Sequence, residues 1–362
     1  MTDRAQRLEA LIAQSGFADA RREPLAGDAS TRRYVRLIGP TRRAMLMDAP
    51  RTAESPPCPP SATADERMAL GWNAISRLAA SRVEAFVAVA DYLCASGLSA
   101  PKIYGVDVEA GYAIVEDLGD ALFARVIGHG ADEIALYEAA TDVLAHVHAQ
   151  TPPAAMQAPG GQWPLLDYDT LALRANADLF IEWIDKGAPN VTITDSARAK
   201  WDALIGNLVT AANDFPRAFT IRDYHAENLI WLPDRGGVKR VGLLDFQDAV
   251  RGWRAWDFSM LLHDARRDVS PAASEAALQR YFAQTGAAEA PFREELALLG
   301  ALNTLRILGI FSRLVARDGK KRYRDFMPRE WGHLSRALDH PSLGALRSFV
   351  GEIAGDYKRR AA

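Results

Sequence analysis

A predicted β-hairpin near the middle of this chain constrains its fold more than any other feature. Residues 229–232 and 241–244 are apolar runs of the kind that form strands, and the Asp-Arg-Gly-Gly sequence at 234–237 is typical of the turn between two such strands. Asn228 stands directly before the first run, and Asp245 directly follows the second. We therefore expect both side chains at the two feet of one hairpin, at the same end of a sheet.

A third polar residue, Asp223, precedes Asn228 by five positions. A single Asp or Asn in a loop is most often a turn former, because its side chain hydrogen-bonds nearby backbone. Here, however, one carboxylate can accept a hydroxyl proton, while an amide oxygen and a second carboxylate are hard oxygen ligands that suit Mg²⁺. Because phosphoryl transfer depends on positioning and charge neutralisation, the pattern predicts a phosphoryl-transfer site. Asp223 is the expected base, and Asn228 and Asp245 are the expected Mg²⁺ ligands.

Composition narrows the class of protein. With 362 residues, of which 49% are hydrophobic, the chain is long enough for two lobes with separate cores. The net charge is -3 and no long basic cluster occurs, so nucleic acid is a poor candidate partner. The two cysteines, Cys58 and Cys94, indicate a reducing compartment. The N-terminus carries no apolar signal core, and no run approaches the length of a membrane span. We expect a cytoplasmic monomer without a membrane partner.

The N-terminal third of the chain alternates between strand and helix patterns. An amphipathic helix is expected at 3–15, and two further helices are expected at 64–80 and 82–96. Residues 56–60, Pro-Pro-Cys-Pro-Pro, form neither helix nor central strand. Strands are predicted at 34–38, 44–47, 102–106 and 112–115.

From about residue 121 onward the pattern is largely helical. We expect this helical pattern to be interrupted by a strand, a loop and the hairpin at 219–246. The Pro- and Gly-rich stretch at 152–164 is interpreted as a loop between helices.

Several segments between residues 25 and 315 carry a family resemblance. They are 25–37, 46–50, 115–120, 222–229, 245–249, Trp256-Asp257 and 307–314. On these segments the chain resembles the aminoglycoside phosphotransferase and choline kinase-like family. Within it, the chain is most similar to the bacterial kinases that phosphorylate the anomeric hydroxyl of N-acetylmuramate and N-acetylglucosamine during cell-wall recycling.

The resemblance implies an α+β, two-lobed protein-kinase-like fold. A small N-terminal β-sheet lobe, residues 1–118, would bind the nucleotide, and a larger, mostly helical C-terminal lobe, residues 119–362, would bind the acceptor. The implied cofactors are ATP and Mg²⁺. Asp223 is again the implied base, and Asn228 and Asp245 are again the implied metal ligands.

The resemblance also assigns the nucleotide contacts. The backbone of Glu116, Asp117 and Leu118 would be the hinge that hydrogen-bonds adenine. A turn of small residues exposes backbone N–H groups to an anion, so the turn that would lie over the phosphates is Gly27, Asp28, Ala29 and Ser30.

Two departures from the family pattern bear on these roles. Ile221 stands where the family commonly has a histidine two residues before the base. The third strand, at 44–48, offers no lysine to grip the phosphates. Arg32 or Arg33 is our candidate for that charge, and the alternative is that both are solvated hairpin residues. Asp257 is expected to brace the catalytic loop or cap a helix rather than touch substrate.

Polar and aromatic residues that suit a sugar acceptor occur mostly in the predicted helical lobe. Sugar faces stack on aromatic rings, and sugar hydroxyls seek carboxylates and amides. Trp183 also fits the apolar stripe of a core helix, and Arg306 with Arg313 suits either a substrate carboxylate or a structural ion pair. The candidates are Trp163, Asn176, Glu182, Trp183, His225, Gln247, Asn303, Arg306 and Arg313.

The sequence thus predicts an ATP- and Mg²⁺-dependent kinase that makes an amino-sugar 1-phosphate from a small-molecule acceptor. One alternative is a kinase of another hydroxyl compound, such as an aminoglycoside, choline or homoserine. Another is a catalytically inactive nucleotide-binding module, which the missing lysine and histidine would favour and the complete set of Asp223, Asn228 and Asp245 disfavours.

Overall fold

The computed structural model describes residues 3–25, 31–51 and 54–361. These residues form two compact units. The sheet unit comprises Met1–Ala131, Thr151–Asp167 and Glu227–Val250, and the helical unit comprises Asp132–Gln150, Tyr168–Ala226 and Arg251–Ala362. The units follow backbone packing, whereas the lobes expected at 1–118 and 119–362 are defined by function, and that boundary stays a prediction.

The sheet unit contains a five-stranded antiparallel sheet, in the order β1-β2-β3-β5-β4, with several helices and two hairpins. Its elements are α1 (Asp3–Gln14), β1 (Arg21–Pro24), β2 (Arg33–Ile38), β3 (Arg43–Asp48), α2 (Ala64–Leu70), α3 (Trp72–Ser76), α4 (Val83–Ala95), β4 (Ile103–Asp107), β5 (Tyr112–Glu116), α5 (Phe123–Gly128), β6 (Ala155–Ala158), β7 (Gly161–Pro164), β9 (Leu229–Trp231), the 3₁₀ helix η1 (Gly237–Arg240) and β10 (Val241–Leu243).

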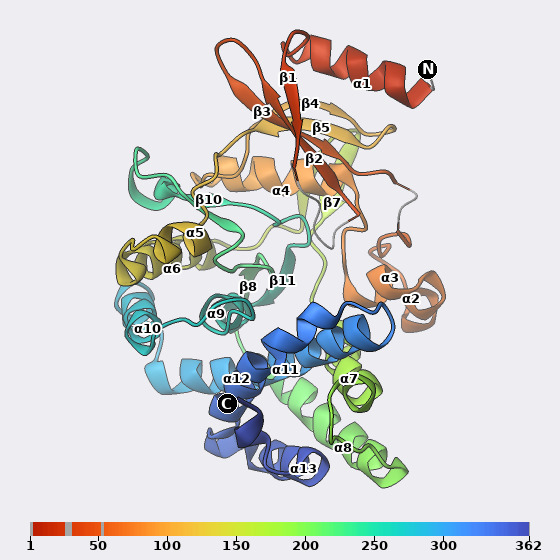
Figure 1. Ribbon diagram of the computed structural model, residues 1–362, viewed down its shortest axis with the longest axis vertical. Coiled ribbons are helices and arrows are strands. Elements are labelled where there is room, and N and C mark those ends of the chain that lie inside the picture. The colour runs from red at the N-terminus through yellow and green to blue at the C-terminus, as the bar shows by residue number, and fades with distance from the viewer. Residues whose placement is uncertain (1–2, 26–30, 52–53, 362) are drawn as a thin grey trace. The chain divides into compact units, whose positions relative to one another are not determined.

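Helix α1 covers one face of this sheet (Figure 1). Leu11 and Ile12 of α1 pack in one buried cluster with Leu46 of β3 and Ile114 of β5. Because side chains alternate along a strand, Met45 and Val115 point to the opposite face, where Phe86 of α4 lines the same cavity as they do. The alternation of side chains along these strands therefore places one set of residues against α1 and the other set against the cavity.

The predicted elements of the sheet unit are confirmed in most cases, with exceptions at α2 and α3, at β1 and at residues 152–164. The single helix expected at 64–80 is two short helices, α2 and α3, because Gly71 between them has φ 96° and cannot continue a helix. Strand β1 was not predicted, since Arg-Arg-Glu-Pro is charged and lacks apolar alternation. It pairs with β2 at the sheet edge, where charged and proline residues are tolerated.

The prediction of a loop at 152–164 is also wrong in part. Residues 155–158 and 161–164 form the antiparallel hairpin of β6 and β7, in which Met156 pairs with Trp163. Its turn contains Gly160 and Gly161, both with positive φ. The hairpin packs against α4, so tertiary contact stabilises a segment whose composition is typical of a loop.

The hairpin at the centre of the sequence is confirmed. Strands β9 and β10 pair antiparallel, with Leu229 opposite Leu243 and Trp231 opposite Val241. The connection is longer than a tight turn, because η1 begins at Gly237, the last residue of the Asp-Arg-Gly-Gly sequence, and runs to Arg240. The backbone N–H of Leu244 donates to the carbonyl oxygen of Asn228 at 2.9 Å, which extends the pairing to the feet of the hairpin.

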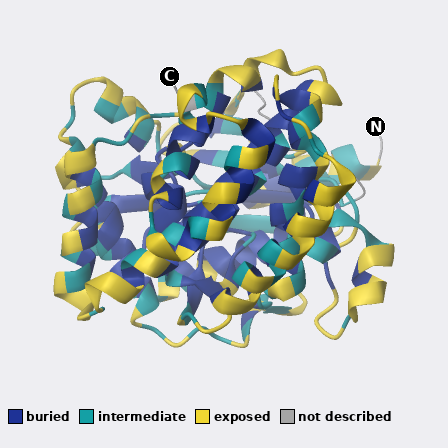
Figure 2. Cartoon of the chain, turned by 90° about the horizontal axis from the view of Figure 1, so that it is seen from below, coloured by how far each residue is buried: buried dark blue, intermediate teal, exposed yellow. Residues whose placement is uncertain are grey.

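The helical unit is built mainly of long helices. Its elements are α6 (Glu133–His148), α7 (Thr170–Gly187), α8 (Asp195–Ala212), β8 (Arg217–Thr220), β11 (Val250–Trp253), α9 (Arg254–Leu262), α10 (Pro271–Thr285), α11 (Glu289–Ala316), η2 (Lys321–Phe326), α12 (Met327–Leu338), η3 (Pro341–Leu343), α13 (Gly344–Ala354) and η4 (Tyr357–Ala361). Strands β8 and β11 form a two-stranded sheet. Several of these helices carry buried residues along one side and exposed residues along the other (Figure 2), whereas α9 is buried throughout from Ala255 to Leu262.

Helices α7 and α11 pack at very close range. A Cβ atom added to Gly309 would lie 2.3 Å from the carbonyl carbon of Leu179, and one added to Gly187 would lie 2.3 Å from Cα of Ser312. Larger residues at either glycine would therefore force the helices apart. This close approach brings polar residues on the two helices within hydrogen-bonding distance.

Helix α11 has the length and composition of a membrane span, so the expectation that no run approaches that length is wrong. However, 78% of the most apolar stretch of this helix is buried inside the protein. It packs against α7, α9 and α12. Its apolar composition is accounted for by its place in the core.

Candidate active site

A cavity of about 310 Å³ lies on the α4 side of the sheet, entirely within the sheet unit. Its walls come from the sheet, from α4, from the segment after β5 and from the feet of the β9–β10 hairpin. The lining residues are Leu25, Arg32, Tyr34, Met45, Phe86, Pro101, Val115, Glu116, Asp117, Leu118, Gly119, Asn228, Ile230, Leu244 and Asp245. The cavity therefore gathers the predicted hinge, one candidate phosphate-binding arginine and both predicted metal ligands.

Asn228 and Asp245 both line this cavity, from the two feet of the hairpin, as the hairpin predicted. The pairing of Leu244 with Asn228 holds the two feet together. Asp245 has φ 56°, in the left-handed region that only a few non-glycine residues adopt. The backbone turns sharply there, at the point where the chain leaves β10.

Arg32 reaches Asp245 from the segment before β2. Its Nη2 donates to Oδ1 of Asp245 at 2.6 Å, and its Nη1 donates to Oε1 of Gln247 at 2.5 Å. Burial opposes the positive charge, but Tyr34, Asp245 and Asp248 outweigh it and raise the pKa of Arg32. A guanidinium ion is therefore held against the predicted metal ligand.

The other candidate, Arg33, is exposed. It is the first residue of β2 and lies opposite Asp48 in the register. The structure thus distinguishes two arginines that the sequence left equivalent. Gly27, Asp28, Ala29 and Ser30, the predicted phosphate turn, lie outside the described residues.

Gln247 and Asp248 extend the polar group around Asp245. Nε2 of Gln247 donates to Oδ1 of Asp245 at 3.0 Å and to Oδ2 of Asp248 at 3.2 Å. Asp248 in turn accepts the backbone N–H of Ala79 at 2.5 Å. Gln247, expected on the acceptor side, belongs to the sheet unit and is bonded to Arg32 and Asp245. Asp248 was not among the candidates, although it stands three residues after Asp245 in the same motif.

The predicted hinge lines the same cavity, and its charged side chains have structural partners. Oε1 of Glu116 accepts from Nη2 of Arg235 at 2.7 Å, and Oδ2 of Asp117 lies 2.8 Å from Nε of Arg36. Oδ1 of Asp117 accepts the backbone N–H of Gly119 at 2.9 Å. These contacts hold the segment from Glu116 to Gly119 in one conformation.

The loop that carries Asp223 belongs to the helical unit. It follows β8, and Asp257 of α9 accepts two of its backbone N–H groups, that of Ile221 at 2.8 Å and that of Arg222 at 2.9 Å. Arg222 has φ 79°, and its guanidinium lies 4.7 Å from the ring centre of Tyr168. Ile221, in the position of the usual histidine, is 1% exposed and packs in the core.

Asp257 therefore contacts the backbone of this loop, as expected of a bracing residue. Complete burial raises its pKa to about 7, and the N–H groups of Ile221 and Arg222 oppose that rise. The hydroxyl of Tyr224 adds a further anchor by donating to the carbonyl oxygen of Ala140 at 2.8 Å. The backbone on both sides of Asp223 is thus tied to neighbouring helices.

Replacing Asp257 by alanine is expected to lower the free energy of unfolding by about 2–4 kcal/mol, because two buried N–H groups lose their acceptor. Asn keeps one acceptor oxygen and is expected to cost less. Urea unfolding of both variants checks this, with the exposed Asp214→Ala as control. An unfolding midpoint for Asp257→Ala equal to that of the wild type would contradict the bracing role.

The predicted acceptor residues of the helical unit fall into separate groups. Nε of Arg306 donates to Oδ1 of Asn176 at 3.2 Å, and its Nη1 donates to Oδ1 of Asn303 at 2.9 Å. Nε2 of His225, two residues after Asp223, lies 3.4 Å from Nη1 of Arg266.

The remaining candidates lie farther along α7 and α11. Glu182 is exposed. Trp183 is half-buried, with the ammonium group of Lys186 4.8 Å from its ring centre, so it is not a core residue. Burial lowers the pKa of Arg313, and Arg317 lowers it further.

Residues 21–294 match the Phosphotransferase enzyme family. The chain belongs to this family. The kinase is 49% identical to the N-acetylmuramate/N-acetylglucosamine kinase of Caulobacter vibrioides, over 97% of this chain and 97% of that protein. It is 31% identical to the protein of the same description from Pseudomonas aeruginosa, over 91% of this chain and 88% of the relative. Family membership implies a hydroxyl acceptor and the use of ATP.

The kinase also resembles solved structures. A choline/ethanolamine kinase family protein from Mesorhizobium loti superimposes with a TM-score of 0.59 and 16% sequence identity, and the match covers 96% of this chain and 99% of that one. This likeness confirms the predicted α+β, two-lobed kinase-like fold.

Proposed function

We propose that the protein is an ATP- and Mg²⁺-dependent kinase of the anomeric hydroxyl of N-acetylmuramate and N-acetylglucosamine, with the sugar 1-phosphate as product and a role in peptidoglycan recycling. The observation that carries the proposal is that Asn228 and Asp245, at the two feet of one hairpin, line the same cavity as the predicted hinge. The names of the relatives, which span nearly the whole chain, support the choice of acceptor.

The donor set in this cavity fits Mg²⁺. Mg²⁺ in phosphoryl-transfer sites is held by one or two protein oxygens together with phosphate oxygens and water. The carboxylate of Asp245 and the amide oxygen of Asn228 are such hard ligands, and both are half-exposed. Bound Mg²⁺ would neutralise charge on the transferred phosphoryl group.

In this proposal the chain's own residues bind and orient the reactants. The backbone of Glu116 to Leu118 binds adenine, and Asp223 accepts the proton of the attacking hydroxyl. An anomeric hydroxyl is more acidic than other sugar hydroxyls, so the demand on the base is modest. Orientation and charge neutralisation then account for most of the rate.

Acceptor contacts from the helical unit are also proposed. His225 is near the base in sequence, and Asn176, Glu182, Trp183, Arg306 and Arg313 offer amide, carboxylate, aromatic and guanidinium groups. Gln247, bonded to Arg32 and Asp245, is proposed as an acceptor contact from the sheet unit. We also propose that the protein acts as a monomer in the cytoplasm, where both of its free cysteines stay reduced.

Arg32 is proposed to supply the charge that the absent lysine provides elsewhere in the family. Arg32→Ala is expected to raise KM for ATP by about 10- to 100-fold, because charge-assisted hydrogen bonds are lost. The exposed Arg33→Ala is the matched control and is expected to leave KM unchanged. Steady-state kinetics with ATP varied makes the comparison. Equal KM values for the wild type and both variants would mean that the phosphates are gripped elsewhere.

An acceptor panel tests the proposed function. ADP release with Mg²⁺ and ATP is measured with N-acetylglucosamine, N-acetylmuramate, choline, homoserine and kanamycin. Release that depends on either amino sugar supports the proposal. Preference for another acceptor would refute the assigned substrate, and silence across the panel would favour a nucleotide-binding module.

A further inference from the structure

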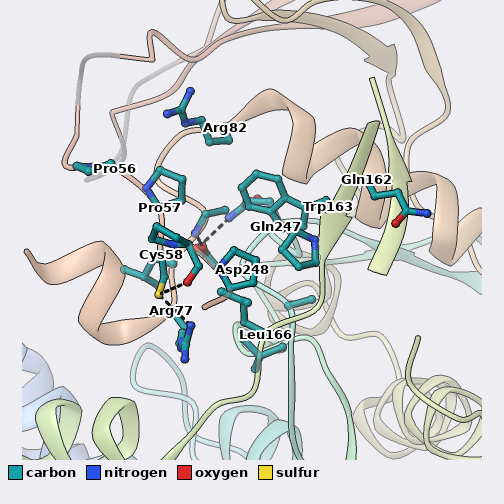
Figure 3. A pocket seen from close by; sticks show the side chains of 17 residues that line it. Pro56, Pro57, Cys58, Arg77, Arg82, Gln162, Trp163, Leu166, Gln247 and Asp248 are labelled. Atoms are coloured by element: carbon teal, nitrogen blue, oxygen red, sulfur yellow. Dashed lines mark hydrogen bonds between the residues drawn. The ribbon is translucent and has the colours of Figure 1, made fainter. Parts of the chain in front are cut away.

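A second cavity of about 460 Å³ lies within the sheet unit. Four segments form its walls: the Pro-rich run 56–60, the turn between α3 and α4, strand β7 with the residues after it, and residues 247–250. Figure 3 shows Pro57, Trp163 and Gln247 around this pocket, with Arg82 at one edge and Arg77 at another. Its volume is in the range of sites that bind small molecules.

Hydrogen bonds connect the wall of this cavity to Asp245, the proposed Mg²⁺ ligand that lines the first cavity. Gln247 lines the second cavity, and its amide donates to Asp245 at 3.0 Å and accepts from Arg32 at 2.5 Å, two residues that line the first. Asp248, also on the wall of the second cavity, is bonded to Gln247 at 3.2 Å. A molecule in the second cavity would therefore lie one side chain away from a proposed Mg²⁺ ligand.

The walls combine an aromatic face, apolar rings and polar groups. Trp163 is half-buried, and the prolines of the run 56–60 add apolar rings to the wall. The amide of Gln247 and the carboxylate of Asp248 stand beside them. Pyranose rings have apolar faces and a polar rim, so an indole face beside amide and carboxylate groups matches a sugar better than a purely apolar ligand.

The two arginines on the wall, Arg77 and Arg82, differ in the polar contacts that they make. Nη1 of Arg77 donates to Sγ of Cys58 at 2.9 Å. Glu84, the nearest acidic neighbour of Arg82 along the chain, is paired with Arg51 at 3.0 Å. Over residues 3–25, 31–51 and 54–361, no carboxylate forms an ion pair with Arg82. Burial and the positive charge of Arg51 lower the pKa of Arg82, and the more distant attraction of Glu84 offsets this only in part.

We propose that this cavity binds the sugar ring of the acceptor, with Trp163 stacked on one face of the ring and Arg82 paired with the carboxylate of N-acetylmuramate. The inference rests on the proposed function and adds a site to it. N-acetylglucosamine has no carboxylate. Arg82 therefore distinguishes the two sugars, whereas Trp163 serves both.

Arg82→Gln is expected to raise KM for N-acetylmuramate by about 10- to 100-fold, with KM for N-acetylglucosamine and for ATP unchanged. Arg82→Lys is expected to restore part of the loss. The exposed Arg21→Ala is the control and should match the wild type. Equal losses on both sugars, or no loss on N-acetylmuramate, would overturn the role of Arg82.

Trp163→Ala is expected to raise KM for both sugars by about tenfold, while KM for ATP stays unchanged and Trp163→Phe retains most of the affinity.

A binding measurement separates this inference from the proposed function. Without ATP, each sugar should quench the fluorescence of the wild type, and Trp163→Phe should abolish that change. If no sugar is phosphorylated but this quenching is observed, the proposed function fails and the site stands. Normal KM values in Trp163→Ala, or an undiminished signal in Trp163→Phe, would overturn the site.

Discussion

Replacing Asp223 by alanine is expected to lower kcat by about 10²- to 10⁴-fold and to leave ATP binding intact, because the variant loses the group that accepts the hydroxyl proton. The loop itself should persist, since Asp257 and Tyr224 hold its backbone independently of the Asp223 side chain. Steady-state turnover with N-acetylglucosamine, together with calorimetric titration of ATP, measures the two effects separately.

Two further variants show whether the loss is specific to the base. Asp223→Asn keeps the size and polarity of the side chain but cannot accept the proton, and it should be nearly as slow as Asp223→Ala. Asp214→Ala removes an exposed carboxylate from the same unit and should be unaffected. Near-normal turnover of Asp223→Asn would refute the assignment of Asp223 as the base.

Replacing Asp245 by alanine is expected to lower kcat/KM for ATP by about 10²- to 10⁴-fold, because a Mg²⁺ ligand contributes several kcal/mol of charge stabilisation in the transition state. The variant also leaves Arg32 without the carboxylate to which it donates at 2.6 Å. Activity measured as a function of Mg²⁺ concentration should show a higher half-saturating concentration than in the wild type.

Asp245→Asn separates the two consequences of that change. It keeps an acceptor for Arg32 but is a weaker metal ligand, so its need for Mg²⁺ should rise while the fold remains unaltered. Asp234→Ala, in the exposed turn of the same hairpin, is the control. If Asp245→Ala showed the Mg²⁺ dependence of the wild type, Asp245 would not be a ligand.

The central hairpin shows why part of the site could be predicted from sequence. Two apolar runs separated by Asp-Arg-Gly-Gly determine which residues stand at the feet, and local pairing then brings Asn228 and Asp245 together. The bracing role of Asp257 was also predicted, and its two bonds to loop backbone agree with it. These features depend on short-range pattern or on one recognisable motif.

Other features depended on contacts between distant segments, which a sequence pattern does not contain. Arg32 and Arg33 are adjacent in sequence, and only the folded structure shows that Arg32 bonds to Asp245 while Arg33, the first residue of β2, is exposed. Trp163 lies in a stretch whose composition is typical of a loop, yet it pairs with Met156 in a hairpin that packs on α4. Trp163 was predicted as an acceptor candidate, but the cavity that it lines is built from four separate segments, and no sequence pattern indicates that these segments meet.

The most direct test of the proposed activity is the position of the new phosphate on the product. Purified protein is incubated with N-acetylglucosamine, ATP and Mg²⁺, and the product is examined by ³¹P and ¹H nuclear magnetic resonance. We predict a sugar 1-phosphate, in which the anomeric proton is coupled to phosphorus, formed with one ADP per sugar. Phosphate on any other hydroxyl, or ADP release that does not depend on the sugar, would contradict the account.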